Sequence, residues 1–322
     1  MNPKRRDLLK KMGLIGGTTL VPSILTCGCR HHDSFEMDLG KLVNSGPASK
    51  VENVSEMTPI KEETISVVSH EKFEDLHNNH DSKNKLIAKS RDFDKDFSDD
   101  IYMVGDEYKI LLSVVDKLNK LQKYVGHGHF NVVDWNDGVA FTKKARGTGS
   151  GFTKEEIIFL EKIFYRDAVE YGFMGEKVFK EIDRGINRKN TIKVPYSGHF
   201  LVKGQSHELY KSIKKKLGSD LILTSGVRCT MKQFSLFLNK VIDCGGNASK
   251  ASRSIAPPGY SFHGRGDFDI GSRYLGYKNF TSDFAKTDEY KKLVELGFVN
   301  IRYEQDNLQG VRFEPWHIKV DV

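Results

Sequence analysis

The sequence predicts an α+β fold, in which a small mixed or antiparallel sheet with flanking helices follows a mostly helical segment. Two patterns support this prediction. From residue 101 to about 190, apolar residues recur at the spacing of amphipathic helices, whereas from about 196 short apolar runs alternate with helical stretches. The strands are too few for a regular βαβ array, and the sequence contains no internal repeat.

Residues 1–29 have the composition of an export signal. Basic residues come first, and a short apolar run from Met12 to about Thr26 comes next, which is too short to span a bilayer. Arg5-Arg6 followed by a leucine pair resembles a twin-arginine signal. Cys29 resembles a lipoprotein processing site, with an ordinary signal peptide as the alternative. We therefore expect an exported protein in the periplasm or cell envelope, with a membrane lipid anchor on Cys29 as one form.

The charge of the chain does not favour a nucleic-acid partner. The chain of 322 residues carries a formal charge of +7, and residues 1–28 contribute +4 of it. The remaining +3 is mild, and no basic stripe with interleaved aromatic residues stands out, so we expect no nucleic-acid partner. A weakly basic body suits an anionic polymer.

The rest of the chain divides into three regions by composition. Residues 30–100 are polar and lack an apolar period, so we expect a disordered tether. Residues 101–195 form a mostly helical subdomain, in which Thr153 and Glu156 make a capping box. Residues 196–322 form the mixed domain, for which we expect helices at 206–217, 231–242 and 283–296 and strands at 221–224 and 313–320.

Two short segments of the mixed domain supply metal-ligand chemistry. His263 and Asp269 are six residues apart, a span of about 20 Å on a straight strand, but Gly264 and Gly266 between them permit a bend. The later run Glu314-Pro315-Trp316-His317 adds a second histidine. Two histidines and one carboxylate, with a fourth position open, form the ligand set of catalytic zinc sites. Glu314, outside this set, would serve as a general base.

A third segment, Ser225-Gly226-Val227-Arg228, comes directly after a short buried strand. Arg228 there can direct a fixed fork of donors at a carbonyl or carboxylate oxygen, which suits stabilisation of an oxyanion. Gln233, five residues later at the start of a helix, can hydrogen-bond a substrate. A fourth segment, residues 256–260, is a rigid Pro-Pro-Gly turn that leads into the metal segment.

The order and content of these segments resemble the zinc D-Ala-D-Ala carboxypeptidase family of the vancomycin-resistance (VanY-like) type, with the related D,D-dipeptidases. The resemblance covers residues 221–320. The family carries Ser-Gly-Tyr-Arg-Ser with a Gln five residues after the Arg, then Pro-Gly-Tyr-Ser-x-His-x-x-Gly-x-Ala-x-Asp, and a late Glu-Pro-Trp-His. The matching residues here are Ser225, Gly226, Arg228, Gln233, Pro258, Gly259, Tyr260, Ser261, His263, Gly266, Glu314, Pro315, Trp316 and His317.

The resemblance implies a zinc metallopeptidase that hydrolyses peptidoglycan peptides ending in D-Ala. The main hypothesis is a D-alanyl-D-alanine carboxypeptidase; the alternatives are a D,D-dipeptidase, a cell-wall endopeptidase, and a non-catalytic zinc-containing wall-binding lipoprotein. Gln233, Ser261 and Trp316 are assigned to substrate binding, with a core position as the alternative for Trp316. Arg228, Arg265 and the loop at 252–254 are candidates for reading the terminal carboxylate.

The chain departs from the family pattern in the metal segment. The family usually places its His and Asp seven residues apart, whereas His263 and Asp269 are six apart, and Val227 replaces the usual Tyr. Asp267 is therefore a second candidate ligand. Because Ile270 and Gly271, directly after Asp269, match the residues directly after the family's aspartate ligand, we assign Asp269.

Two further residue pairs invite a functional interpretation. Cys229 and Cys244 are candidates for a disulfide in an oxidising compartment, with two buried thiols as the alternative. His127 and His129 are two residues apart, so on a strand they point to opposite faces. We do not expect them to bind one metal together, although they could line a substrate cleft.

Overall fold

The computed structural model describes residues 79–320. The predictions for the export signal, for Cys29 and for residues 30–78 lie outside these described residues. No helix within 79–320 is long and apolar enough to cross a membrane. The helices are α2 (His80–Arg91), α3 (Gly105–Val125), α4 (His127–Phe130), α5 (Trp135–Thr142), α6 (Lys154–Tyr165), α7 (Gln205–Leu217), α8 (Thr230–Asp243), α9 (Ala248–Ser252) and α10 (Asp288–Glu295).

The strands form two small antiparallel sheets, which confirms the predicted fold class. One sheet pairs β1 with β2, and the other has the order β3-β4-β5. In the second sheet Ser225 lies opposite Asp269, and Asp269 lies opposite His317. The strands are β1 (Thr191–Lys193), β2 (Phe200–Val202), β3 (Leu221–Ser225), β4 (Phe268–Ser272) and β5 (His317–Ile318).

Two predicted elements are shorter than the sequence pattern suggested. The closing strand predicted at 313–320 is reduced to β5, and Pro315 explains part of this because it has no N–H to donate to a ladder. The helix predicted at 283–296 divides into a 3₁₀ turn, Ser282–Lys286, and α10. Thr287 separates them, because its hydroxyl accepts a hydrogen bond from the N–H of Tyr290 and caps α10.

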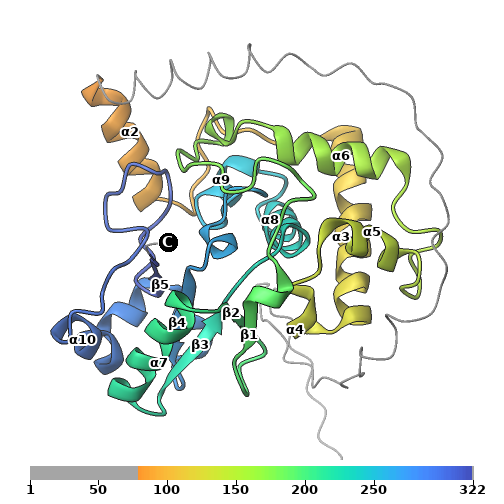
Figure 1. Ribbon diagram of the computed structural model, residues 1–322. Helices are drawn as coiled ribbons and strands as arrows, with labels where there is room; N and C mark the ends of the chain where they lie inside the picture. The colour runs from red at the N-terminus through yellow and green to blue at the C-terminus, as the bar shows by residue number, and fades with distance from the viewer. Residues whose placement is uncertain (1–78, 321–322) are drawn as a thin grey trace, which may run out of the picture. The chain divides into compact units, whose positions relative to one another are not determined.

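The first hydrophobic core joins the helical region to the mixed domain. It contains residues of α3, α5 and α6, and it also contains the apolar face of α8 and residues of α9. α8 thus lies against the long helix α3 at a position between α3 and the strands (Figure 1). This core crosses the boundary predicted at residue 195. The capping box predicted at Thr153 and Glu156 is confirmed at the start of α6.

The second core lies around the three-stranded sheet. Leu221, Leu223, Phe268 and Ile270 contribute from β3 and β4, and side chains of α7 and α10 pack against them. The two cores together fix the chain segment between β3 and α8, which is the segment that carries Arg228.

Residues 79–100 differ from the tether predicted for them. They form α2 and a loop that packs on the mixed domain. The carboxylate of Asp100 is fully buried, where it pairs with Arg253 and accepts a hydrogen bond of 2.8 Å from Asn247 Nδ2. Asp96 accepts a second bond from Asn247, at 3.0 Å. Because these partners lie about 150 residues away in the sequence, local composition does not reveal the ordering.

Of the two alternatives for Cys229 and Cys244, the structure supports free thiols over a disulfide. Both cysteines are free thiols, and they cap opposite ends of α8. A helix of 14 residues separates its ends by about 21 Å, whereas a disulfide needs Cα atoms within about 7 Å. Burial raises the pKa of the Cys229 thiol to about 11, so this thiol is unreactive at neutral pH.

The packing of α3 predicts a contrast between two leucines on the same helix. Leu118 is fully buried in the first core, whereas Leu112 is 44% exposed. Leu118→Ala removes buried methyl groups and should lower the free energy of unfolding by about 2–5 kcal/mol. Leu112→Ala, the matched control, should change it by no more than about 0.5 kcal/mol. Urea denaturation measures both; equal effects would contradict the assigned packing of α3.

Candidate metal centre

Three side chains predicted as metal ligands lie together at one end of the three-stranded sheet. Asp269 is in β4, His317 is opposite it in β5, and His263 is in the 3₁₀ turn Phe262–Gly264. Asp269 Oδ1 lies 3.4 Å from His263 Nε2 and 3.5 Å from His317 Nδ1. All three residues are buried, and one ligand atom from each lies within 4.8 Å of the others. The structure therefore brings the predicted set together.

The bend that brings His263 to Asp269 depends on a glycine. Gly266 has a φ of +122°, a conformation that residues with a Cβ rarely adopt. A Cβ on Gly266 would also lie 2.5 Å from Ser206 Oγ, which donates a hydrogen bond to the Gly266 carbonyl. The segment from His263 to Asp269 thus folds back within six residues, as the sequence suggested.

The polar atoms of this cluster fit a metal ion. His263 Nδ1 lies 2.7 Å from the carbonyl oxygen of Gly226, which can only accept, so Nδ1 carries the hydrogen and Nε2 presents its lone pair to the cluster. His263 Nε2 and Asp269 Oδ1 are buried and have no hydrogen-bond partner within residues 79–320. Two imidazole nitrogens and one carboxylate oxygen are the donor set that zinc takes in catalytic sites.

The second candidate ligand, Asp267, lies outside the cluster. One of its oxygens is 3.0 Å from His317 Nε2, on the side of the ring opposite the cluster. Arg302 donates two hydrogen bonds to Asp267, and the N–H of Val320 donates a third. Asp267 therefore holds the ring of His317 so that Nδ1 faces Asp269, as carboxylates commonly do for metal-binding histidines.

The electrostatics of the cluster favour ligand protonation states at two of the three residues. Burial would raise the pKa of Asp269, but the positive charges around it, on His263 and Arg228 first, outweigh burial and hold the pKa well below its usual range. Burial, together with Arg228, lowers the pKa of His263. Despite burial, hydrogen bonds to Asp267 and Glu314 raise the pKa of His317 to about 9, so a metal ion must displace a proton there.

Arg228 and Glu314, the predicted catalytic residues, both contact the cluster. Arg228 Nη2 donates to Asp269 Oδ2 at 2.6 Å, and its Nε donates to Ser225 Oγ at 3.0 Å. Glu314 is buried, with Oε2 3.5 Å from His317 Nδ1. Arg228 thus stabilises the ligand carboxylate in this structure, and its part in catalysis stays a prediction.

The predicted substrate-binding residues have different surroundings. Gln233 Nε2 donates to the carbonyl oxygen of Ala256 at 2.6 Å, while its Oε1 is buried without a partner among the described residues. Ser261 is buried immediately before the turn that carries His263. Trp316 is only 3% exposed, belongs to the second core, and packs edge-on against Phe280.

Two of the arginines considered for reading a terminal carboxylate are already paired elsewhere. Arg253 forms the buried ion pair with Asp100, and Arg265 pairs with Glu176 at the surface. His127 and His129 lie on the short helix α4 and not on a strand. His127 and His129 are not members of the metal cluster found within residues 79–320.

Sequence reasoning missed His199, whose ring lies 6.3 Å from that of His127. Burial, with the nearby positive charges of His127, Arg228 and Lys232, lowers the pKa of His199 to about 4. Its Nδ1 is buried without a partner in the described part of the chain. No motif marks this residue, because its burial depends on the packing of α4 against the strand β2.

The two aspartates predict different zinc affinities. Asp269→Ala removes a ligand and should abolish stoichiometric zinc binding, whereas Asp267→Asn leaves all three ligands and should weaken binding by about 10- to 100-fold. Asp243→Asn, at the exposed end of α8, is the control and should bind zinc as the wild type does. Competition with a chromophoric chelator measures the affinities. Tighter binding by Asp269→Ala than by Asp267→Asn would contradict the assignment.

The buried His199 predicts acid sensitivity. Its pKa of about 4 in the folded protein lies below the ordinary value of 6.5. Between these values the unfolded chain binds more protons, so stability is complete above about pH 6.5 and falls as the pH falls toward about 4. In chelator-treated protein, wild type should therefore lose more melting temperature over this window than His199→Gln. Parallel pH profiles of wild type and His199→Gln would contradict this; His80→Gln on the exposed start of α2 is the control.

Two solved structures of known proteins resemble part of the chain. They are a mutant of the vancomycin-resistance D,D-pentapeptidase VanY from a VanB-type cassette in complex with Zn(II), and VanYB in complex with D-alanine-D-alanine. The first is 22% identical, covers 42% of this chain and 83% of its own, and has a TM-score of 0.33. The second is 23% identical, covers 42% and 84%, and has a TM-score of 0.30.

No curated protein matches the chain. The family model of the VanY D-alanyl-D-alanine carboxypeptidases matches residues 201–320, a segment that contains the complete metal cluster, Arg228 and Glu314. Over residues 201–320, this chain is therefore similar to the VanY D-alanyl-D-alanine carboxypeptidases.

Proposed function

We propose that this protein is a zinc-dependent D-alanyl-D-alanine carboxypeptidase that removes the terminal D-Ala of peptidoglycan stem peptides. The observation that carries the proposal is the buried cluster of His263, Asp269 and His317 with Glu314 beside it, inside a segment that matches this family. A zinc carboxypeptidase needs a metal site and an adjacent base, and this cluster supplies both. A non-catalytic binding protein would have no use for the carboxylate of Glu314.

His263 Nε2, Asp269 Oδ1 and His317 Nδ1 are the atoms that would hold zinc. When bound, zinc polarises the scissile carbonyl and lowers the pKa of a water molecule to about 7. Glu314 accepts a proton from the attacking water and returns it to the leaving amine of D-Ala. Arg228, already directed at this end of the sheet by Ser225, stabilises the negative charge that develops on the carbonyl oxygen.

We also propose that the protein acts in the cell envelope. The support is the composition of residues 1–29, which resembles a twin-arginine export signal, and the location of the substrate. A lipid on Cys29 would keep the enzyme at the membrane surface next to the wall. Mass spectrometry of the mature protein from its host checks both points: the expected form begins at Cys29 and carries acyl chains.

The role of Glu314 predicts a specific loss of activity. Glu314→Gln keeps the shape of the side chain but removes the base, so kcat should fall by about 100- to 10,000-fold while zinc stoichiometry stays at the wild-type value. Release of D-Ala from a synthetic pentapeptide ending in D-Ala-D-Ala measures the rate. Glu295→Gln, at the exposed end of α10, is the control.

Unchanged turnover by a zinc-loaded Glu314→Gln protein would refute the base assignment.

The products distinguish the enzyme classes of this fold. A carboxypeptidase releases single D-Ala residues from muropeptides, a D,D-dipeptidase cleaves free D-Ala-D-Ala, and an endopeptidase cuts cross-links. Mass spectrometry of digested muropeptides separates these outcomes.

A further inference from the structure

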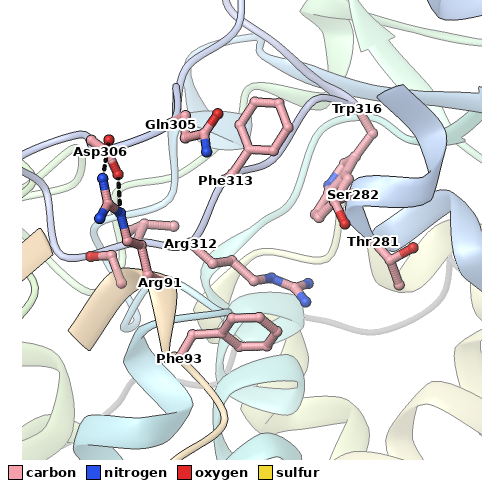
Figure 2. A pocket seen from close by; sticks show the side chains of 11 residues that line it. Arg91, Phe93, Thr281, Ser282, Gln305, Asp306, Arg312, Phe313 and Trp316 are labelled. Atoms are coloured by element: carbon pink, nitrogen blue, oxygen red, sulfur yellow. Dashed lines mark hydrogen bonds and ion pairs between the residues drawn. The ribbon is translucent and has the colours of Figure 1, made fainter. Parts of the chain in front are cut away.

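A cavity of about 280 Å³ is lined in part by Arg312, whose Nε lies 3.6 Å from Oε1 of the proposed base Glu314. Figure 2 shows its walls: the end of α2 with Arg91 and Phe93 on one side, Thr281 and Ser282 on another, and Arg312 and Trp316 from the segment that leads into β5. Arg91 and Phe93 come from outside the segment that the family model matches, which begins at residue 201.

The side chain of Arg312 extends across this cavity between two aromatic rings (Figure 2). Its guanidinium carbon lies 5.0 Å from the centroid of Phe93 and 5.0 Å from that of Trp316. Such stacking fixes the guanidinium plane and leaves its edge available for hydrogen bonds. Arg312 is thus held in a defined orientation before any ligand binds.

Arg312 lacks a hydrogen-bonded carboxylate, unlike the other arginines near the site. Arg228 is bonded to Asp269, and Arg302 is bonded to Asp267 through two nitrogens. Arg312 Nε is buried without a hydrogen-bond partner within the described residues, and its nearest carboxylate oxygen, Glu314 Oε1, is 3.6 Å away. That separation exceeds an ordinary hydrogen bond. The guanidinium therefore has unused donors.

The charge of the cavity favours an anion. Arg91 on the opposite wall makes two hydrogen bonds of 2.6 Å with Asp306, so these two charges offset each other. Arg312 faces Glu314 only through Nε, at 3.6 Å without a hydrogen bond, so its charge is only partly offset, and Ser282 adds a hydroxyl. A volume near the lower end of the range for ligand pockets suits a carboxylate on a short side chain.

We propose that this cavity is a subsite for a carboxylate of the substrate peptide and that Arg312 is the residue that binds it. The inference rests on the proposed function. Arg312 Nε lies 3.6 Å from Glu314 Oε1, so the guanidinium that would bind this carboxylate lies next to the proposed base. Its source is either the terminal carboxylate of D-Ala or an acidic group earlier in the stem peptide.

Arg312→Gln tests the proposal with three synthetic pentapeptides ending in D-Ala-D-Ala: one with all carboxylates free, one with an amidated C-terminus, and one with its upstream acid amidated. Loss of a charge-assisted hydrogen bond should raise KM for the free peptide about tenfold or more. The same variant should leave KM unchanged for the peptide that lacks the recognised carboxylate, which identifies the source. Arg273→Gln, an exposed arginine after β4, is the control.

Binding of N-acetyl-D-alanine and of its amide to the zinc-loaded proteins, by calorimetry, gives a readout that does not depend on turnover. Arg312→Lys, which keeps the charge but not the fork of donors, should have an intermediate KM. It replaces Arg312→Gln in the test if that variant does not fold. An equal change of KM for all three peptides, or a lower kcat with KM unchanged, would overturn the subsite. If the wild type releases no D-Ala at all, the proposed function fails first, and the two failures are thereby distinguished.

Discussion

The carboxylate of Asp269 is the charge around which the site is organised. Its side chain is only 2% exposed, and an ionised carboxylate buried without partners costs several kcal/mol. Arg228 satisfies Oδ2 at 2.6 Å, while Oδ1 faces two imidazole nitrogens and receives no hydrogen bond from the described residues. A cation between Oδ1 and the imidazoles completes the compensation. Burial of the Asp269 carboxylate therefore explains why an arginine lies at Oδ2 and a metal ion is needed at Oδ1.

The register of the three-stranded sheet places the other residues of the site next to Asp269. Asp269 is central, with Ser225 of β3 on one side and His317 of β5 on the other. Because Ser225 accepts a hydrogen bond from Arg228, the strand that orients the arginine is also the strand paired with the ligand. A slip of one residue in β4 would direct Asp269 to the opposite face of the sheet and separate all of these groups.

Several features of the site were predictable from the sequence because they depend on local chemistry. The glycines between His263 and Asp269 indicated a bend, and the six-residue spacing still brings the two side chains together.

The role of Asp267 was not predictable, since it depends on Arg302 and on His317, which lie 35 and 50 residues away. The choice between a disulfide and free thiols was decidable from the sequence, because the predicted helix 231–242 already separates Cys229 from Cys244 by most of its length. The ordering of residues 79–100 was not predictable locally, because Asp100 depends on Arg253.

The segment before residue 201 contributes side chains to the surroundings of Arg312. α2 and the loop after it bring Phe93 against Arg312, while Asp100 in the same segment pairs with Arg253 in the interior. The N–H of Arg312 in turn donates to the carbonyl oxygen of Arg253 at 2.9 Å. One buried ion pair therefore fixes the backbone beside Arg312 and also the segment that supplies its aromatic partner. In the proposed subsite, substitutions in this segment would alter the orientation of Arg312 while the ligands and Glu314 stay the same, which would place part of the specificity outside residues 201–320.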